Sequence, residues 1–298
     1  MGENFLHKPV LLREVMQFLD PAAGDVIVDA TIGGAGHARE ILRRIGPSGL
    51  LIGIDRDKEA LKIADERLKS SEGSFRLMNG NFKDLKNILQ DSETGEVDGI
   101  LFDMGISSIQ MESAERGFSI KNSGPLDMRM DKTQQLTAAT LVNNLGEFEL
   151  SRLIKHFGEE RFHKRIAASI LMARKEKRIE TTAELAQIIS RSMPFGRRRE
   201  RIHPATRTFQ ALRIKVNEEI SVMEEALKDT PSVLKKGGRV CVISFHSLED
   251  RIAKTTFREF SAQDVFQILT KKPVMAGEDE VMENPRARSA KLRAALKL

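Results

Sequence analysis

The chain has 298 residues, a formal net charge of +5 at pH 7 and a single cysteine, with 40% hydrophobic and 31% charged residues. This composition is typical of a globular protein, and no apolar run reaches the ~20 residues that a membrane-spanning helix needs. The single Cys241 excludes an internal disulfide and a zinc site built from several cysteines. Because the N-terminal segment lacks a signal-peptide pattern, we predict a cytoplasmic protein.

The first part of the chain alternates predicted strands and helices. A helix over 9–19 is followed by strands at 26–30, 50–55, 75–80 and 99–105, with helices at 35–45, 57–69 and 85–89 between them. Short apolar strands separated by helices are typical of a parallel sheet that is covered on both faces. The pattern therefore predicts an α/β fold with a doubly wound sheet.

The alternation stops after the fourth strand. From 106 to 214 the sequence has helical periodicity, including two helices within 146–178 that join at Gly158. The α/β pattern then resumes with a helix at 218–227, a strand at 239–245, a helix at 248–260 and a strand near 266–270. We predict one α/β domain from residues 1–105 and 215–298, into which a mostly helical substrate-recognition domain, 106–214, is inserted.

A glycine-rich loop joins the first strand to the following helix. Gly33, Gly34 and Gly36 stand in this loop, and glycines at such a position favour a small polar ligand that lies against bare backbone. The dinucleotide fingerprint G-x-G-x-x-G fails at its third glycine, which is replaced by Arg39. No Lys follows the glycines, so the phosphate-binding loop of ATP and GTP enzymes is absent as well. A nicotinamide-dependent oxidoreductase therefore stays only as a disfavoured alternative.

Three acids end successive predicted strands, namely Asp29, Asp55 and Asp103. S-adenosylmethionine (SAM) suits them, because it has no phosphate and carries a sulfonium and an ammonium group that negative charge stabilises. Asp55 is placed to accept hydrogen bonds from a ribose diol. The alternative is that each Asp caps the helix after its strand. A catalytically silent RNA-binding protein is a further alternative, although such a protein has no need to keep the acids and the glycine loop together.

Seven segments of the sequence are similar to a known family. In chain order they read DATIGGAGHA, GILFDMGISSIQ, ERGFS, GPLDMRMD, HPATRTFQALRI, ISFHSLEDRI and NPRARSAKLR. Together they resemble the bacterial 16S rRNA cytosine-N4 methyltransferases, the RsmH or MraW family, from about His7 to Arg293. The resemblance implies a class I SAM-dependent methyltransferase fold with a helical insertion. It also implies methylation of the exocyclic N4 amine of a cytidine in the decoding region of 16S rRNA. We expect this rRNA within the small ribosomal subunit or a late assembly particle as the partner, although the sequence leaves protein-free rRNA open as the substrate.

The same resemblance implies a set of cofactor contacts. These are Gly33, Ala35, Gly36 and His37 in the loop, Asp55 at the ribose, Phe82 near the adenine, and Asp103 and Gln110. Where the family loop usually reads G-G-H-S, this chain has Ala35-Gly36-His37-Ala38. Ala35 is expected to donate its backbone N–H to the cofactor if its dihedral angles accommodate a Cβ, whereas Ala38 lacks a hydroxyl that could cap the helix.

Methyl transfer to cytosine N4 needs acceptors for the amino hydrogens, because the lone pair of this nitrogen is delocalised into the ring. The segment DMGISS directly follows the fourth predicted strand. We predict that Asp103, helped by Ser107 and Ser108, provides these acceptors and later receives the proton. The alternative is that Asp103 only binds the cofactor, and that positioning of the two substrates dominates catalysis.

The target base must be exposed before the enzyme can reach it. Because the chain has 15 Phe but no Trp or Tyr, Phe118 is predicted to stack on a base, whereas core packing is favoured for Phe245 at a strand end. His246, with Glu249 and Asp250, is expected to line the cytidine pocket. We predict no metal site in this segment, because a single His with nearby acids is common at a helix N-terminus.

A basic run precedes the return to the α/β pattern. It supplies Arg197, Arg198, Arg199, Arg201 and Arg207, which we predict to contact RNA phosphates, the alternative being a solvated surface. The segment NPRARSAKLR fits either a last strand or an RNA contact, and the sequence alone does not separate the two.

Overall fold

The chain folds as two compact units. The computed structural model describes residues 8–194 and 202–298, with one unit formed by Met1–Gly105 and Ile220–Leu298 and the other by Ile106–Glu219. The later boundary lies after Glu219 rather than after Ile214, because helix α10, Thr206–Asn217, runs unbroken within the second unit and packs against helix α7, Glu147–Gly158, of that unit. Within the described ranges, no helix combines the length and apolarity needed to cross a bilayer.

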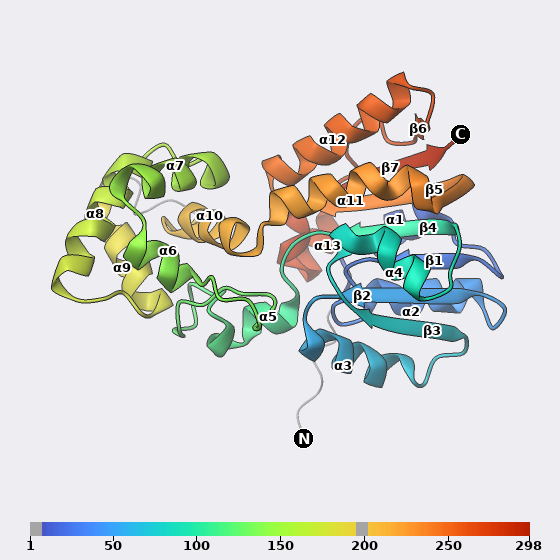
Figure 1. Ribbon diagram of the computed structural model, residues 1–298, viewed down its shortest axis with the longest axis horizontal. Helices are drawn as coiled ribbons and strands as arrows, with labels where there is room; N and C mark the ends of the chain where they lie inside the picture. The colour runs from blue at the N-terminus through green and yellow to red at the C-terminus, as the bar shows by residue number, and fades with distance from the viewer. Residues whose placement is uncertain (1–7, 195–201) are drawn as a thin grey trace. The chain divides into compact units, whose positions relative to one another are not determined.

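The first unit is built on a seven-stranded sheet with the order β3-β2-β1-β4-β5-β7-β6 (Figure 1). Its strands are β1 (Val26–Asp29), β2 (Leu50–Asp55), β3 (Ser74–Asn79), β4 (Val97–Asp103), β5 (Leu234–Ser244), β6 (Phe266–Ile268) and β7 (Lys291–Lys297). All neighbouring strands pair in parallel except β7, which pairs antiparallel with both β5 and β6. The predicted doubly wound α/β sheet is therefore confirmed, and NPRARSAKLR contains a short 3-10 helix, Pro285–Ser289, followed by the start of β7.

Helices cover both faces of this sheet. They are α1 (Leu12–Leu19), α2 (Gly36–Ile45), α3 (Lys58–Leu68), α4 (Leu85–Asp91), α11 (Glu219–Val233), α12 (Ser247–Ala262) and α13 (Glu278–Glu283). Ile27 and Leu51 belong to the hydrophobic cluster with α1, α2 and α3, whereas their strand neighbours Val28 and Ile52 belong to the cluster with α4, α11 and α12. Because successive strand residues point to opposite faces, two covered faces explain why these strands are apolar at nearly every position.

The first helix begins later than the sequence predicts. Pro9 was expected in its first turn, but the helix starts at Leu12 because Leu11 has a left-handed backbone with φ 55°. The Leu11 N–H donates to Glu280 Oε1 at 2.7 Å, so a distant segment fixes this helix start. Such a long-range contact leaves no local signal in the sequence.

The second unit is helical in its described part. Its helices are α5 (Ser108–Glu112), α6 (Ala138–Asn144), α7 (Glu147–Gly158), α8 (His163–Glu176), α9 (Thr182–Ser192) and α10, with a short 3-10 helix at Ala114–Arg116. They enclose a core of their own. The predicted helix pair indeed separates at Gly158, where a Cβ would lie 2.5 Å from the carbonyl oxygen of Arg207.

The GPLDMRMD segment anchors the start of this helical unit. A Cβ at Gly124 would lie 1.8 Å from the carbonyl oxygen of Ala114, so the two backbone segments touch. Further along, the Met130 N–H donates to Asn217 Oδ1 at 2.8 Å, and the Asn217 amide donates to the Met128 carbonyl at 2.8 Å. Asn217 is 2% exposed, so it joins the segment to the end of α10 from inside the unit.

Candidate functional site

The glycine loop, residues 30–35, leads from β1 into α2 and is held by the neighbouring strand and helix. Gly33 has φ 47° and donates its N–H to Asp55 Oδ2 at 3.0 Å. Arg67 on α3 donates to the Gly34 carbonyl at 2.7 Å. The loop is therefore fixed by side chains from two elements before any ligand binds.

Ala35, whose N–H is predicted to contact the cofactor, makes a hydrogen bond within the loop itself. Its N–H donates to the Ile32 carbonyl at 2.8 Å, so this donor is already used within the loop. Ala35 has a left-handed backbone with φ 61° and is fully buried, and at such angles a Cβ costs about 1–2 kcal/mol. At the next position, a Cβ on Gly36 would lie 3.1 Å from Cβ of Pro9, so close packing alone accounts for this glycine.

Asp55 ends β2 with its carboxylate oriented by two backbone donors. Oδ1 accepts from the Asp57 N–H at 2.9 Å, and Oδ2 accepts from Gly33. The Asn79 amide donates to the Asp55 carbonyl at 3.0 Å, which ties the neighbouring strand to the same point. Burial raises the pKa of Asp55 to about 6, against the two backbone hydrogen bonds, which lower it.

The three acids do not cap the helices that follow them, so the capping alternative is wrong. Helix α2 begins after Ala35, and the α3 cap is Asp57, whose side chain accepts from the Glu59 N–H at 3.1 Å. The cap of α5 is Ser107. Asp29 and Asp55 instead accept hydrogen bonds from backbone N–H groups of the loops that follow their strands.

Asp29 is buried and Asp103 is half-buried, and the two stand at the ends of neighbouring strands. Asp29 is 2% exposed, and burial, reinforced by the charge of Asp55, raises its pKa to about 7. Burial also raises the pKa of Asp103 well above its ordinary value, and the charges of Asp29 and Glu249 push it further in that direction. This end of the sheet therefore concentrates negative groups that a bound cation would stabilise in their ionised form.

His37 connects Asp103 to the segment before α1. Its Nε2 lies 2.9 Å from the Val10 carbonyl oxygen, which can only accept, so Nε2 carries a proton. Its Nδ1 lies 3.5 Å from Asp103 Oδ2. The other oxygen, Asp103 Oδ1, is shielded from solvent and has no hydrogen-bond partner among the described residues. The Asp103 N–H donates to Thr31 Oγ1 at 2.7 Å, which fixes the end of β4 against the glycine loop.

Three other predicted site residues have ordered surroundings. Phe82 lies in the short helix Phe82–Asp84 after β3, half-buried, with its ring 5.7 Å from the Phe102 ring in an edge-on arrangement. In the second unit, Ser107 Oγ accepts from the Gln110 N–H at 3.2 Å, and Gln110 Oε1 accepts from the Ser107 N–H at 3.3 Å. This capping box explains the pair structurally, so their roles at a site remain predictions, as does the role of Ser108.

The end of β5 places His246 at the cap of α12. Its Nδ1 accepts from the Glu249 N–H at 3.3 Å, while Nε2 lies 3.1 Å from Glu249 Oε1 without the alignment of a hydrogen bond. Glu249 is 3% exposed, and its Oε2 accepts from the Phe245 N–H at 2.8 Å. Asp250 instead pairs with Arg293 at 2.6 Å, so its charge is already matched.

The predicted RNA contacts have different outcomes. Phe118 is 5% exposed and packs in the core of the second unit, so the stacking role is not supported and core packing takes its place. Arg207 is exposed on α10 and donates to the Glu159 carbonyl at 3.1 Å. Arg197, Arg198, Arg199 and Arg201, which are predicted to contact RNA phosphates, lie outside the described residues.

Sequence reasoning missed two residues that build the loop. Thr31 lies inside the motif itself, and a hydroxyl directly after a strand that ends in Asp is a signal that could have identified it. Arg67 lies on α3, 33 positions beyond its partner Gly34, and a charged residue on a helix is ordinarily expected to face solvent. No local pattern therefore points to this contact.

The comparison of the sequence with a family model and the comparison with known proteins agree with each other. The model of the MraW methylase family matches residues 4–298. A protein of Geobacter sulfurreducens named ribosomal RNA small subunit methyltransferase H is 51% identical over 99% of this chain and 100% of its own length. A protein of the same name from Persephonella marina is 50% identical, with 98% and 99% covered.

Among solved structures, an rRNA methylase from Streptococcus thermophilus aligns over 97% of this chain and 92% of its own at 11% identity with a TM-score of 0.41, a likeness too weak to carry an argument.

Proposed function

The chain belongs to the MraW methylase family and is an rRNA methyltransferase, and on that premise we propose that it methylates the exocyclic N4 amine of a cytidine in the decoding region of 16S rRNA. SAM is its cofactor. The nicotinamide oxidoreductase and the catalytically silent RNA-binding protein are therefore set aside. The observation that carries the proposal is Asp103 Oδ1, which is shielded from solvent, accepts no hydrogen bond within residues 8–194 and 202–298, and lies near the buried acids Asp29 and Glu249.

The residues at the carboxyl edge of the sheet fit the chemistry of SAM. Burial alone penalises the ionised forms of Asp29, Asp55 and Asp103, and a sulfonium or ammonium group repays that penalty. We assign the ribose diol to Asp55, whose two oxygens keep lone pairs beyond those that its backbone donors occupy. Phe82, half-buried after β3, is assigned to the adenine, and the loop from Gly33 to His37 to the methionine part, without the Ala35 N–H.

Asp103 and His37 form a pair that is suited to receive a proton. SAM supplies the methyl group as the electrophile and leaves as the neutral thioether. Because His37 Nε2 carries a proton toward Val10, its Nδ1 can accept the proton of Asp103 Oδ2 when this carboxyl is protonated. Oδ1 then accepts a hydrogen bond from the cytosine amine, which orients the nitrogen lone pair toward the methyl group. After the new N–C bond forms, Oδ1 takes the excess proton of the amine, and where Asp103 was already protonated on Oδ2, that proton moves to His37 Nδ1.

The remaining assignments follow from the position of β5 and from the substrate. We assign contact with the cytidine to His246, because the α12 cap stands at the same carboxyl edge as Asp103. Arg207 is assigned to an RNA phosphate because it is an exposed cation. We propose the small ribosomal subunit, or a late assembly particle, as the natural substrate, and the cytoplasm as the place of the reaction.

The experiment is transfer of tritiated methyl groups from SAM onto small subunits purified from cells that lack this activity. Nucleosides from the digested rRNA are then separated and identified by mass spectrometry. N4-methylcytidine is the expected product, and a methyl group on a ring carbon or a ribose oxygen would overturn the proposal. Parallel reactions with protein-free 16S rRNA and with assembled subunits determine which of the two is the substrate.

The variants Asp103→Ala and His37→Gln test the proton relay. We expect transfer to fall about 100-fold or more with Asp103→Ala, which is the usual range for loss of a general base. S-adenosylhomocysteine should still bind both variants, as calorimetry can measure. Unchanged transfer by Asp103→Ala would leave positioning alone as the catalytic device and remove the relay.

A further inference from the structure

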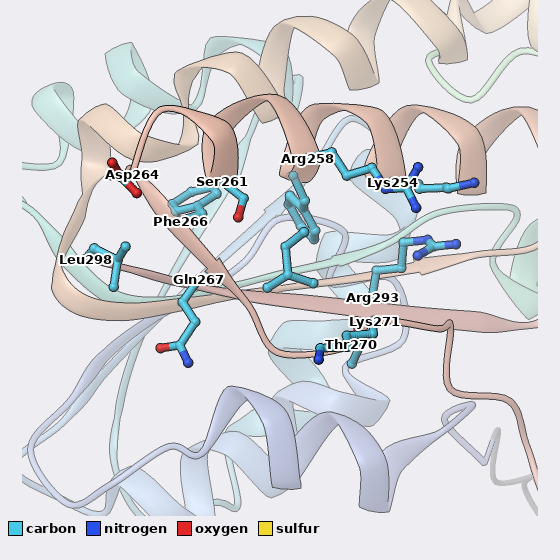
Figure 2. Close-up of a pocket in the computed structure, with 12 residues that line it drawn as sticks. Lys254, Arg258, Ser261, Asp264, Phe266, Gln267, Thr270, Lys271, Arg293 and Leu298 are labelled. Carbon is cyan, nitrogen blue, oxygen red and sulfur yellow. The ribbon is translucent and has the colours of Figure 1, made fainter.

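A cavity of about 670 Å³ lies between α12 and the β6–β7 edge of the sheet, within the first unit (Figure 2). It is lined by Lys254, Phe257, Arg258, Ser261, Asp264, Phe266, Gln267, Ile268, Thr270, Lys271, Arg293 and Leu298. None of these residues belongs to the site described above. Its volume falls within the range of about 300–1,000 Å³ that is usual for ligand sites.

Three cations of this cavity have no partner within the described part of the chain. Lys254 and Arg258 lie four residues apart on α12 and therefore share one face of the helix, while Lys271 follows β6. No ion pair or hydrogen bond of these three side chains occurs among residues 8–194 and 202–298. By contrast, Arg293 is 7% exposed and already pairs with Asp250.

The cationic residues lie toward one end of the cavity. In Figure 2, Lys254 and Arg293 stand at the end opposite Asp264, the one acid in the lining. Strand β6 runs in the same direction as β5, because both pair antiparallel with β7. Lys271, just beyond the end of β6, therefore lies toward the carboxyl edge of the sheet, where α12 also begins. The cationic end of the cavity thus faces the edge that holds Asp103 and His246.

We propose that Lys254, Arg258 and Lys271 bind phosphates of the RNA strand on one side of the target nucleotide. Three unpaired cations around one hollow repel one another, and a polyanion that neutralises them releases counterions on binding. The substrate of an rRNA methyltransferase is such a polyanion. Gln267, exposed on the edge strand, adds an amide beside them that can hydrogen-bond to a ribose hydroxyl. The inference rests on the proposed function for one point, which is that the target base lies at the carboxyl edge of the sheet, so that the adjoining RNA strand can reach the cavity.

The test compares the wild type with the triple variant Lys254→Gln, Arg258→Gln, Lys271→Gln. A second triple variant, Lys62→Gln, Lys228→Gln, Lys236→Gln, removes the same charge from exposed positions on α3, α11 and β5 outside the cavity. Binding to small subunits is measured at several salt concentrations, together with KM and kcat for methyl transfer. Affinity for S-adenosylhomocysteine and the melting temperature confirm that each variant is folded.

We expect the cavity variant to raise KM for subunits about ten-fold while kcat stays within about two-fold, because the reacting groups are untouched. Three lost phosphate contacts should reduce the slope of log affinity against log salt by about 2, at ~0.7 per phosphate of a single strand. A cavity variant that matches the control variant in both quantities would overturn the inference. If the melting temperature of the triple variant falls, the double variant Arg258→Gln, Lys271→Gln is used instead. The separate variant Lys254→Arg keeps the positive charge and is expected to keep the wild-type slope. Failure of the wild type to make N4-methylcytidine would refute the proposed function, whereas the binding slopes would still decide on the cavity.

Discussion

Binding of the cofactor should depend on pH because, while the site contains no cation, Asp55 holds a proton at pH values below its raised pKa. Its pKa is raised to about 6, so about nine-tenths of the carboxyl groups are protonated near pH 5 and almost none near pH 8. If the ribose and the nearby cation favour the ionised form, the dissociation constant of SAM carries the factor 1 + 10^(pKa − pH). This factor is about 11 at pH 5 and about 1 at pH 7.5, so Asp55 alone contributes a roughly ten-fold gain in affinity across this range, to which ionisation of Asp29 adds.

The assay is calorimetric titration with S-adenosylhomocysteine and SAM between about pH 5 and pH 7.5, in buffers that differ in ionisation enthalpy. Near pH 5, Asp55 should account for almost one of the protons that binding releases. The variant Asp55→Asn should bind more weakly and lose this proton and its share of the pH dependence, whereas Asp91→Asn, which removes an exposed carboxylate at the end of α4, should keep both. A wild-type affinity that is independent of pH would refute the reasoning that a burial-perturbed Asp55 contacts the cofactor.

The same groups set the pH dependence of the free protein. Because the folded-state pKa values of Asp29 and Asp55 lie above the ordinary value, the folded state binds protons more tightly than the unfolded chain. Their contribution to the free energy of unfolding is therefore present at low pH and is lost as the pH rises from about 4 to about 7.

Three further predictions concern single residues of the first unit. Ala35→Gly should raise the free energy of unfolding by about 0.5–1 kcal/mol in a denaturant titration, since it relieves a left-handed backbone, while Ala38→Gly inside α2 should lower it by a similar amount. Gly105→Val should cost about 2 kcal/mol or more in the same titration, because the backbone has φ 122° and a Cβ would lie 2.9 Å from the Phe245 ring; an unchanged midpoint would contradict this. Asp103→Asn should melt no lower than the wild type near pH 8, because a buried carboxylate is removed, although methyl transfer falls about 100-fold or more.

The sequence predicts the parallel part of the sheet well because its signals are local. Val26–Asp29 and Leu50–Asp55 are apolar runs that end in an acid, and the structure confirms them as β1 and β2. Asp57 and Lys69, predicted as the ends of a helix, are the caps of α3. The ends of β5 and β6 are less visible, since β5 begins at Leu234 within LKKGG, and β6 has only three residues. Leu234 at the start of β5 pairs with Val97 of β4, and β6 pairs with β7, so both ends depend on partners that are distant in the sequence.

The candidate site is predictable in its acids but not in its supports. Asp29, Asp55 and Asp103 stand at strand ends, so the sheet alone brings them to one edge. The hydrogen bond of the Ala35 N–H within the loop goes with the left-handed φ angle of this residue. Because Ala rarely adopts such an angle, the sequence gives no sign of it. Burial of Phe118 likewise depends on the packing of the helical unit, and an isolated aromatic residue carries no sign of which side of a helix or loop is covered.

The position of β7 has a consequence for biosynthesis. Residues 266–268 leave the ribosome before residues 291–297, yet within the sheet β6 pairs only with β7. Until β7 emerges, one side of β5 is an unpaired edge, and Phe266 has no strand to hold it against the sheet. If translation stalls after β6 and before β7 has emerged, the unpaired edge of β5 is exposed and prone to aggregation. A chaperone would therefore act on the chain at this stage of synthesis.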